Sequence, residues 1–186
     1  MTPSASSSPA ITEFQHSCQK YFICYTFAVS GLEDYAKKLA SLTKDHTKNL
    51  IVGTGHPDKG QWHASIKISE AINSSQKNGV FADKIAKSFV TAMYSEWDEY
   101  YRQKLAQEAA VTAKSVQCDL MGDLRLIRHC IVHSKSTITD EHKKLKQLRW
   151  SLSPGTFTIT KEMLSTLIDQ VNHMLVRIES EPTKVI

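Results

Sequence analysis

The chain has 186 residues, of which 41% are hydrophobic and 23% charged, values that suit one soluble domain with its own core. It contains few glycines (7) and prolines (5), which disfavours a β-sandwich or barrel because those folds use such residues in their many turns. The formal net charge of +4 is too small to indicate nucleic acid by itself, and no apolar run reaches the roughly 18 residues needed to span a membrane.

The first ten residues, MTPSASSSPA, have neither a basic head nor an apolar stretch. They therefore predict a disordered tail over residues 1–10 rather than a signal peptide, followed by a single domain over residues 11–186. The four cysteines form no C-x-x-C pair and predict a reduced, intracellular, cytoplasmic protein. They are Cys18, Cys24, Cys118 and Cys130.

From Ile11 to Leu42 the apolar residues recur three or four positions apart, which predicts a long helix that bends near Ser30–Gly31. The following stretch GTGHPDKGQ, residues 53–61, predicts a loop. It lacks the G-x-x-x-x-G-K-[ST] pattern of a nucleotide-triphosphate site, so its role stays open. A shorter helix is expected from Ala64 to Lys77, ended by an Asn-Gly break.

A second long helix is predicted from Val80 to Ala109, with Trp97 in the core. Further helices are expected over residues 113–132 and, as a short basic segment, over residues 140–149. An extended piece at residues 153–160 leads to a last helix, capped by Thr160, whose apolar stripe continues to Ile178. With no alternating strand pattern, the sequence predicts an all-α fold, an antiparallel bundle of four to five helices.

The stretch GDLRLIRHCIVHS, which begins at Gly122, concentrates positive charge on one helix. At about 100° per residue, an apolar stripe falls on one side, and Arg125, His129 and His133 fall on the opposite side with Arg128 at the edge of the stripe. The stripe consists of Leu120, Leu124, Ile127 and Ile131. The helix is expected to stop near His133, because Ser134–Thr137 has poor helix propensity.

Four such groups repel one another unless an anion or an acidic neighbour is present. Arginine matches phosphate oxygens in two-point contacts, and histidine transfers protons near neutral pH, so the set suits metal-independent cleavage of a phosphodiester. The segment from Arg125 to Arg149 adds further cations that suit a phosphate backbone, opposed only by two acids. These additional candidates for substrate binding are Lys135, Lys143 and Lys144.

Two other interpretations of the same residues stay open. In the first, Arg125 and Arg128 pair with Asp98 or Glu99 on a neighbouring helix and have a structural role. In the second, His129 and His133 bind zinc with a cysteine as third ligand. Zinc is the weaker idea, because Cys130 points about 100° away from His129 and the arginines repel a cation. No cofactor or metal is therefore expected.

The segment Arg128–His133 resembles the R-x-x-x-x-H signature of the HEPN superfamily, in which His is an accepted alternative to Asn after the arginine. GDLRLIRHCIVHS resembles the family's DLR-x-x-R-N-x-x-x-H form, and EWDEYYRQKL, residues 96–105, resembles its W-E-x-Y-R helix. The SPGTFTIT stretch before a final helix is similar to the usual ending. The resemblance extends from about Trp97 to the C-terminus.

This resemblance implies a four- or five-helix bundle that dimerises, with the two motifs facing each other. It implies a metal-independent ribonuclease that uses the ribose 2′-hydroxyl as nucleophile, in a toxin–antitoxin, phage-defence or RNA-processing setting with a protein partner such as an antitoxin. His133 would act as general acid or base, Arg128 would stabilise charge on the phosphate, His129 would orient the substrate or assist, and Arg125 would contact phosphate. Other family members are non-catalytic modules for RNA or nucleotide binding or for dimerisation, and this is the alternative hypothesis.

Overall fold

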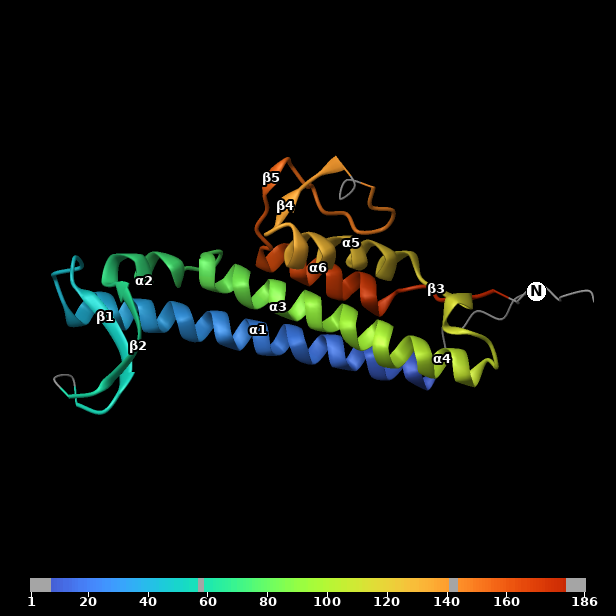
Figure 1. Cartoon of the computed structure of the whole chain (residues 1–186), viewed down its shortest axis with the longest axis horizontal. Helices are drawn as coiled ribbons and strands as arrows, with labels where there is room; N and C mark the ends of the chain where they lie inside the picture. Colours follow the sequence, from blue (N-terminus) through green and yellow to red (C-terminus); the bar gives the residue numbers. More distant parts are fainter. Residues whose placement is uncertain (1–7, 57–58, 141–143, 180–186) are drawn as a thin grey trace, which may run out of the picture. The chain divides into compact units, whose positions relative to one another are not determined.

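The computed structural model describes residues 8–56, 59–140 and 144–179, which are mostly helical with three small antiparallel two-stranded sheets. Figure 1 shows the order of these elements along the chain. The predicted predominance of helix is confirmed, whereas the expected absence of strands is wrong. The chain divides into two compact units, which we call the hairpin unit (residues 24–85) and the motif unit (residues up to 23 and from 86 onward). Helices α1 and α3 each contribute to both units, and the single domain expected over residues 11–186 stays a prediction.

Helix α1 spans Pro9–Leu42 and begins two residues before the expected boundary. Ser8 caps it, because the Ser8 hydroxyl accepts a hydrogen bond from the amide of Ala10 at 3.2 Å, and Pro9 occupies the first helical position, where its missing N–H costs nothing. Ala10 is fully buried, so Pro9 and Ala10 do not belong to the predicted tail. Residues 1–7 lie outside the described residues. The helix continues through Ser30–Gly31 without interruption.

The expected helix over residues 80–109 consists of three consecutive parts: α3 (Val80–Glu96), a π-helical turn (Trp97–Tyr101) and α4 (Arg102–Glu108). In the motif unit this rod runs antiparallel to α1. Three side-chain hydrogen bonds establish that direction, because the residue numbers of their partners rise along α1 while they fall along the rod. Ser8 donates to Glu108 at 2.8 Å, Lys104 donates to Glu13 at 2.8 Å, and Ser17 donates to Glu96 at 2.7 Å. Trp97 is buried, as predicted, and its ring centroid lies 5.4 Å from that of Phe14.

Glu96 joins the two helices, because its carboxylate accepts hydrogen bonds from the hydroxyls of Ser17 and Tyr21. Burial and the bond to Glu96 raise the pKa of Tyr21 to about 12, and burial raises the pKa of the Cys18 thiol as well. An unfolded tyrosine loses its proton near pH 10, so the stability due to this group is complete below about pH 10. It is lost as the pH rises from about 10 to about 12.

We therefore expect the free energy of unfolding to fall between about pH 10 and about pH 12, and to fall less steeply in the variant Tyr21→Phe. Urea midpoints measured at pH 7, 9, 10 and 11 by circular dichroism check this. Phe27→Tyr adds a phenol at an exposed position of the same helix and serves as control. An equal alkaline slope in Tyr21→Phe and in the wild type would contradict the expectation.

The hairpin unit contains strands β1 (Asn49–Thr54) and β2 (Gln61–Lys67), paired antiparallel, and helix α2 (Ile68–Ser74). The predicted loop at residues 53–61 is confirmed for residues 55, 56, 59 and 60, which connect the two strands, whereas residues 53, 54 and 61 belong to the strands and residues 57–58 lie outside the described residues. The predicted helix over residues 64–77 is wrong up to Lys67, because Leu50 and Ile66 lie opposite each other in the ribbon and pack against buried Leu39, Ile68 and Ala71. This packing selects the strand over the helix for residues 61–67.

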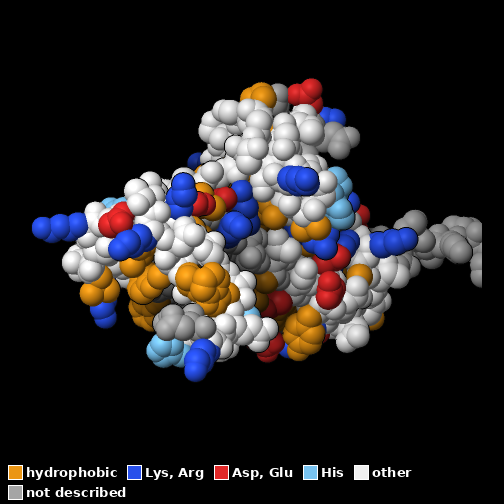
Figure 2. Space-filling model, turned by 60° about the vertical axis from the view of Figure 1, so that its left-hand side comes forward, with side chains coloured by type: hydrophobic (Ala, Val, Ile, Leu, Met, Phe, Trp, Pro, Cys, Tyr) orange, Lys and Arg blue, Asp and Glu red, His pale blue; other side chains and the backbone are white. Residues whose placement is uncertain are grey.

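The expected break after α2 is confirmed, since α2 ends at Ser74 and α3 begins at Val80. Gly79 lies in this connection, where a Cβ atom would collide with the backbone carbonyl oxygen of Ser74. The hairpin unit also exposes several large hydrophobic side chains, a feature visible on the surface in Figure 2 (orange). They include Phe27, Tyr35, Leu42, Ile51, Val52, Trp62 and Val80.

The rest of the motif unit begins with a 3-10 turn (Ala113–Ser115) and strand β3 (Val116–Gln117), so the helix expected from residue 113 starts only at Asp119. Helix α5 (Asp119–His133) is followed by β4 (Thr137–Ile138) and β5 (Gly155–Thr156), which pair antiparallel. The expected extended piece at residues 153–160 thus includes a strand. The expected basic helix over residues 140–149 is wrong for residues 144–149, which form no helix.

Helix α6 (Lys161–Asn172) has the predicted cap, because the Thr160 hydroxyl accepts a hydrogen bond from the amide of Met163 at 3.3 Å. It ends six residues before Ile178, because strand β6 (Arg177–Ile178) pairs antiparallel with β3. Gln15 of α1 donates hydrogen bonds to the backbone carbonyls of Val171 and Asn172 at the end of α6, both at 3.1 Å. The apolar faces of α1, α3, α5 and α6 supply the core of the motif unit.

Candidate functional site

Helix α5 buries the face that the sequence predicts. Leu120, Leu124 and Ile127 are fully buried, and Ile131 is half-buried near the end of the helix. Three side chains outside the predicted stripe are also buried, namely Met121, Asp123 and Cys130. The opposite side of α5 is therefore the side that faces solvent.

The helix ends at His133, as predicted. Lys135 and Ser136 adopt left-handed backbone conformations with φ of 48° and 62°, and the amides of Ser134 and Ser136 both donate to the carbonyl of Cys130, at 3.1 and 3.0 Å. Left-handed residues that close the last turn in this way are a common helix ending. They place His133 in the last turn of α5, at the edge of the motif unit.

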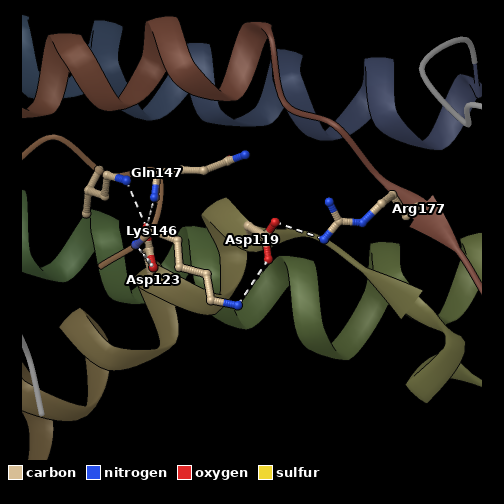
Figure 3. Close-up of polar contacts among 6 residues, drawn as sticks. Asp119, Asp123, Lys146, Gln147 and Arg177 are labelled. Atoms are coloured by element: carbon tan, nitrogen blue, oxygen red, sulfur yellow. Dashed lines mark hydrogen bonds and ion pairs between the residues drawn. The ribbon is translucent and has the colours of Figure 1, made fainter. Parts of the chain in front are cut away.

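Asp123 of α5 forms hydrogen bonds with residues 146–148, in the segment that follows the helix (Figure 3). Its carboxylate, only 2% exposed, accepts hydrogen bonds from the backbone amides of Lys146, Gln147 and Leu148 at 2.7–3.0 Å. A buried carboxylate needs such donors, because an isolated charge in the interior is costly. Three consecutive amides that point at one carboxylate cannot also donate within a helix, which explains why residues 144–149 are not helical.

Asp119, in the first turn of α5, holds two further cations (Figure 3). Its carboxylate lies 2.8 Å from Nη2 of Arg177 and 3.6 Å from Nζ of Lys146. The hydrogen bond from Arg177 holds the pKa of Asp119 below its ordinary value. Lys146 is therefore paired with Asp119, whereas Arg125 and Arg128, farther along α5, form no ion pair within the described residues.

Arg125, His129 and His133 are all exposed and lie along one ridge of α5, as predicted from their spacing. The imidazole centroids of His129 and His133 are 4.9 Å apart, with the rings tilted by 38°. Arg128 is half-buried at the side of this ridge. Its guanidinium carbon lies 6.0 Å from the centroid of the Tyr94 ring, and its Nε is buried without a hydrogen-bond partner in the described chain.

The structural interpretation, in which Arg125 and Arg128 pair with acids of the neighbouring helix, is wrong for the described residues. Asp98 instead pairs within its own helix, where its Oδ1 lies 3.0 Å from Nη1 of Arg102. Within residues 8–56, 59–140 and 144–179, no carboxylate forms an ion pair with Arg125 or Arg128. Neither arginine is therefore neutralised by a carboxylate of the described residues.

The three lysines predicted to help bind a substrate are placed unequally. Lys135 is exposed two residues after the end of α5, in the turn that follows His133. Lys144 is exposed in the non-helical segment just before residues 146–148, whose amides donate to Asp123. Lys143 lies outside the described residues, so only Lys135 is placed next to the ridge by the chain itself.

The cysteines considered as third zinc ligands are oriented by other groups. Cys130 is buried, and its Sγ donates to the backbone carbonyl of Thr137 at 3.2 Å. Cys118 precedes α5 by one residue, fifteen positions before His133, and burial raises the pKa of its thiol. A raised pKa disfavours the thiolate, which is the form that binds metal.

A pocket of about 250 Å³ lies next to the ridge, between the rod that contains the π-helical turn and the start of α5. Its lining is mixed, with aromatic, acidic and basic side chains: Tyr94, Trp97, Asp98, Arg102, Val116, Gln117, Cys118, Met121, Gly122 and Arg125. Sequence reasoning missed Tyr94, Arg102 and Gly122. The π-helical turn, a feature often found at functional sites, was also unexpected, because no residue pattern distinguishes it from α-helix.

Tyr94 connects the pocket to the ridge, because it lines the pocket and carries Arg128 over its ring. Burial, and then the charge of Asp98, raise the pKa of Tyr94, so its phenol stays protonated at neutral pH and can donate a hydrogen bond. The site therefore contains the adjacent imidazoles of His129 and His133, two arginines without acidic partners in the described residues, and a pocket beside them. Such a combination can hold an anion and move a proton.

Two global features complete the description. No helix in the described part of the chain has the length and apolar character required to cross a membrane. In comparisons with known proteins, no family model, no curated protein and no solved structure matches this chain.

Proposed function

We propose that this protein is a HEPN-type, metal-independent endoribonuclease of the cytoplasm, with its site on α5. The observation that carries the proposal is the exposed ridge of Arg125, His129 and His133 beside Arg128, where neither arginine has an acidic partner in the described chain. Two arginines that lie about one helical turn apart repel each other, so an anionic ligand that binds both of them explains why they occur together. A phosphate backbone is the anion that two arginine forks and two imidazoles suit best.

The proposed reaction is transfer of the phosphoryl group within the RNA strand. One imidazole removes the proton of the ribose 2′-hydroxyl, and the 2′-oxygen attacks the adjacent phosphorus. The bond from phosphorus to the 5′-oxygen of the next nucleotide breaks, and that oxygen receives a proton from the second imidazole. The products are a 2′,3′-cyclic phosphate and a free 5′-hydroxyl.

Within this reaction, the 4.9 Å separation of the His129 and His133 rings suits one acid and one base that act on neighbouring oxygens. We assign the principal proton transfer to His133 and a supporting role to His129. Arg128 would stabilise the charge that develops on the phosphate oxygens, and Arg125 would hold the phosphate from the exposed side. Lys135, Lys143 and Lys144 would contact flanking phosphates.

We further propose that the protein acts as a homodimer in which the two α5 ridges face each other. On one helix, Arg128 and His133 are about 140° apart, so a second copy brings opposite halves of the motif closer together. Regulation by an antitoxin-type protein, in a toxin–antitoxin or phage-defence setting, is part of the same proposal. It rests on the resemblance of the motif alone.

Incubation of the purified protein with mixed RNA in the presence of EDTA tests the proposed activity. We expect cleavage that survives chelation and yields 2′,3′-cyclic phosphate ends, which are detected by their resistance to 3′-end-labelling until acid opens the ring and phosphatase then removes the phosphate. Cleavage that requires added Mg²⁺ or Zn²⁺ would overturn the metal-independent reaction. Failure of a folded dimer to cleave any RNA would overturn the catalytic proposal.

The second candidate function is a non-catalytic module in which α5 binds RNA or another copy of the chain. The observation that favours it is the half-buried Arg128, which packs over Tyr94 like a structural side chain. This candidate predicts RNA binding without cleavage, or lower dimer stability in Arg128→Ala without any change in RNA binding. The dependence of RNA affinity on salt separates these outcomes, because each phosphate contact adds to the slope of log K against log salt.

A further inference from the structure

We infer that the pocket beside the ridge binds one nucleobase of the RNA, and that it prefers a base with an exocyclic amino group, namely adenine, cytosine or guanine, over uracil. This inference rests on the proposed binding of RNA at α5 and adds a base-selective subsite to it. The pocket measures about 250 Å³, which is smaller than the roughly 300–1,000 Å³ of pockets for drug-sized ligands and suits a single flat ring system.

The lining supplies the two elements that base recognition requires. Tyr94 is aromatic and only half-buried, and a protein gains affinity for single-stranded RNA when bases stack on such side chains. Asp98 is an acceptor with a fixed position, because Arg102 holds Oδ1 at 3.0 Å and itself donates from Nε to the carbonyl of Val116 at 3.2 Å. No hydrogen bond within the described residues uses Oδ2 of Asp98, so this oxygen can accept one from a ligand.

An amino group is the donor that a carboxylate oxygen accepts from a base edge. Uracil has a carbonyl oxygen where cytosine has its amino group, and its one donor on that edge, N3–H, lies between two carbonyl oxygens that repel a carboxylate. Arg125 lines the pocket and also belongs to the exposed ridge. A phosphate held by Arg125 therefore places the base attached to its sugar at the mouth of the pocket.

Substitution of Gly122, which lines the pocket, can test whether the pocket binds a base. It lies on α5 between two other lining residues, Cys118 and Arg125, and a Cβ atom added to it would meet no atom within 4 Å. A leucine at this position is expected to narrow the pocket, because its Cβ meets no neighbouring atom and its longer side chain extends beyond it, and leucine favours the helix because glycine is a poor helix former. Gly31 of α1 is a matched control, since it is also helical, exposed and without atoms within 4 Å of an added Cβ.

The experiment measures the affinity of the full chain for eight-nucleotide oligo(A), oligo(C) and oligo(U) by fluorescence anisotropy. For the wild type and for Gly31→Leu, we expect oligo(A) and oligo(C) to bind about tenfold more tightly than oligo(U). For Gly122→Leu, we expect all three to bind with the affinity of oligo(U). Thermal unfolding by circular dichroism accompanies these measurements, and Gly122→Leu is expected to melt no lower than the wild type.

The outcomes distinguish this inference from the proposed function. If the wild type binds the three RNAs alike, or if Gly122→Leu keeps the preference, the base pocket is wrong. In that case, binding that still weakens in Arg128→Ala leaves the proposed RNA site in place. If the wild type binds none of the three RNAs, both the proposed function and the base pocket are wrong.

Discussion

Replacement of His133 by alanine is expected to lower the rate of RNA cleavage by about 10²–10⁴-fold, the usual contribution of one general acid or base. The reason is that one of the two proton transfers loses its imidazole, while the arginines still hold the phosphate. RNA affinity is therefore expected to change little. The measurement is single-turnover cleavage of a labelled RNA at saturating protein, which separates the chemical step from binding.

His16→Ala is the matched control, because His16 is also an exposed histidine on a helix of the motif unit but lies on α1, away from the ridge sequence. It is expected to cleave at the wild-type rate. Both histidines are exposed, so neither substitution is expected to change the thermal midpoint by more than a degree or two. Equal cleavage rates in His133→Ala and the wild type would contradict the role assigned to His133.

Replacement of Asp123 by alanine is expected to have the largest effect on stability, a loss of about 3–5 kcal/mol in the free energy of unfolding. The carboxylate is 2% exposed and receives four hydrogen-bond contacts from the amides of residues 146–148. Without it, these donors lose their acceptor and a cavity opens beside α5. For a chain of this size the expected decrease in the thermal midpoint is about 10 °C.

Asp123→Asn tests whether charge or shape matters, since it keeps the volume and one acceptor oxygen but turns an NH₂ group toward backbone N–H donors. It is expected to lose more than half of the stability lost in Asp123→Ala. Asp169→Asn, at an exposed position of α6, serves as control and is expected to change stability by less than about 0.5 kcal/mol. Urea unfolding followed by circular dichroism provides the values. A wild-type midpoint in Asp123→Ala would show that the segment from residue 146 to residue 148 does not depend on this carboxylate.

Residue spacing predicted the features that depend on a single helix. The long helical segments, the Thr160 cap, the end of α5 at His133, and the exposed ridge of Arg125, His129 and His133 are all confirmed. These features follow from the 3.6-residue period and from local capping preferences, which any isolated helix obeys. The functional assignment of that ridge stays a proposal.

The sequence failed where the outcome depends on contacts between distant residues. Residues 61–67 form a strand because β1 pairs with them, and residues 144–149 remain non-helical because their amides are taken by Asp123, more than twenty positions earlier. Glu96 and Asp123 read as ordinary surface acids in the sequence, yet one joins α1 to α3 and the other is buried. A helical wheel cannot foresee a buried carboxylate, because its burial depends on donors supplied by another segment.

The sequence by itself therefore determined which residues form the cationic ridge and on which side of α5 they lie. Only the tertiary structure decided that Asp123 is buried against backbone amides more than twenty positions later in the chain, and that a pocket lies beside the ridge. The physical reason is one of range. The direction of a side chain on a helix is set by its neighbours within one or two turns, whereas charge pairing and concave surfaces arise when separate helices pack together.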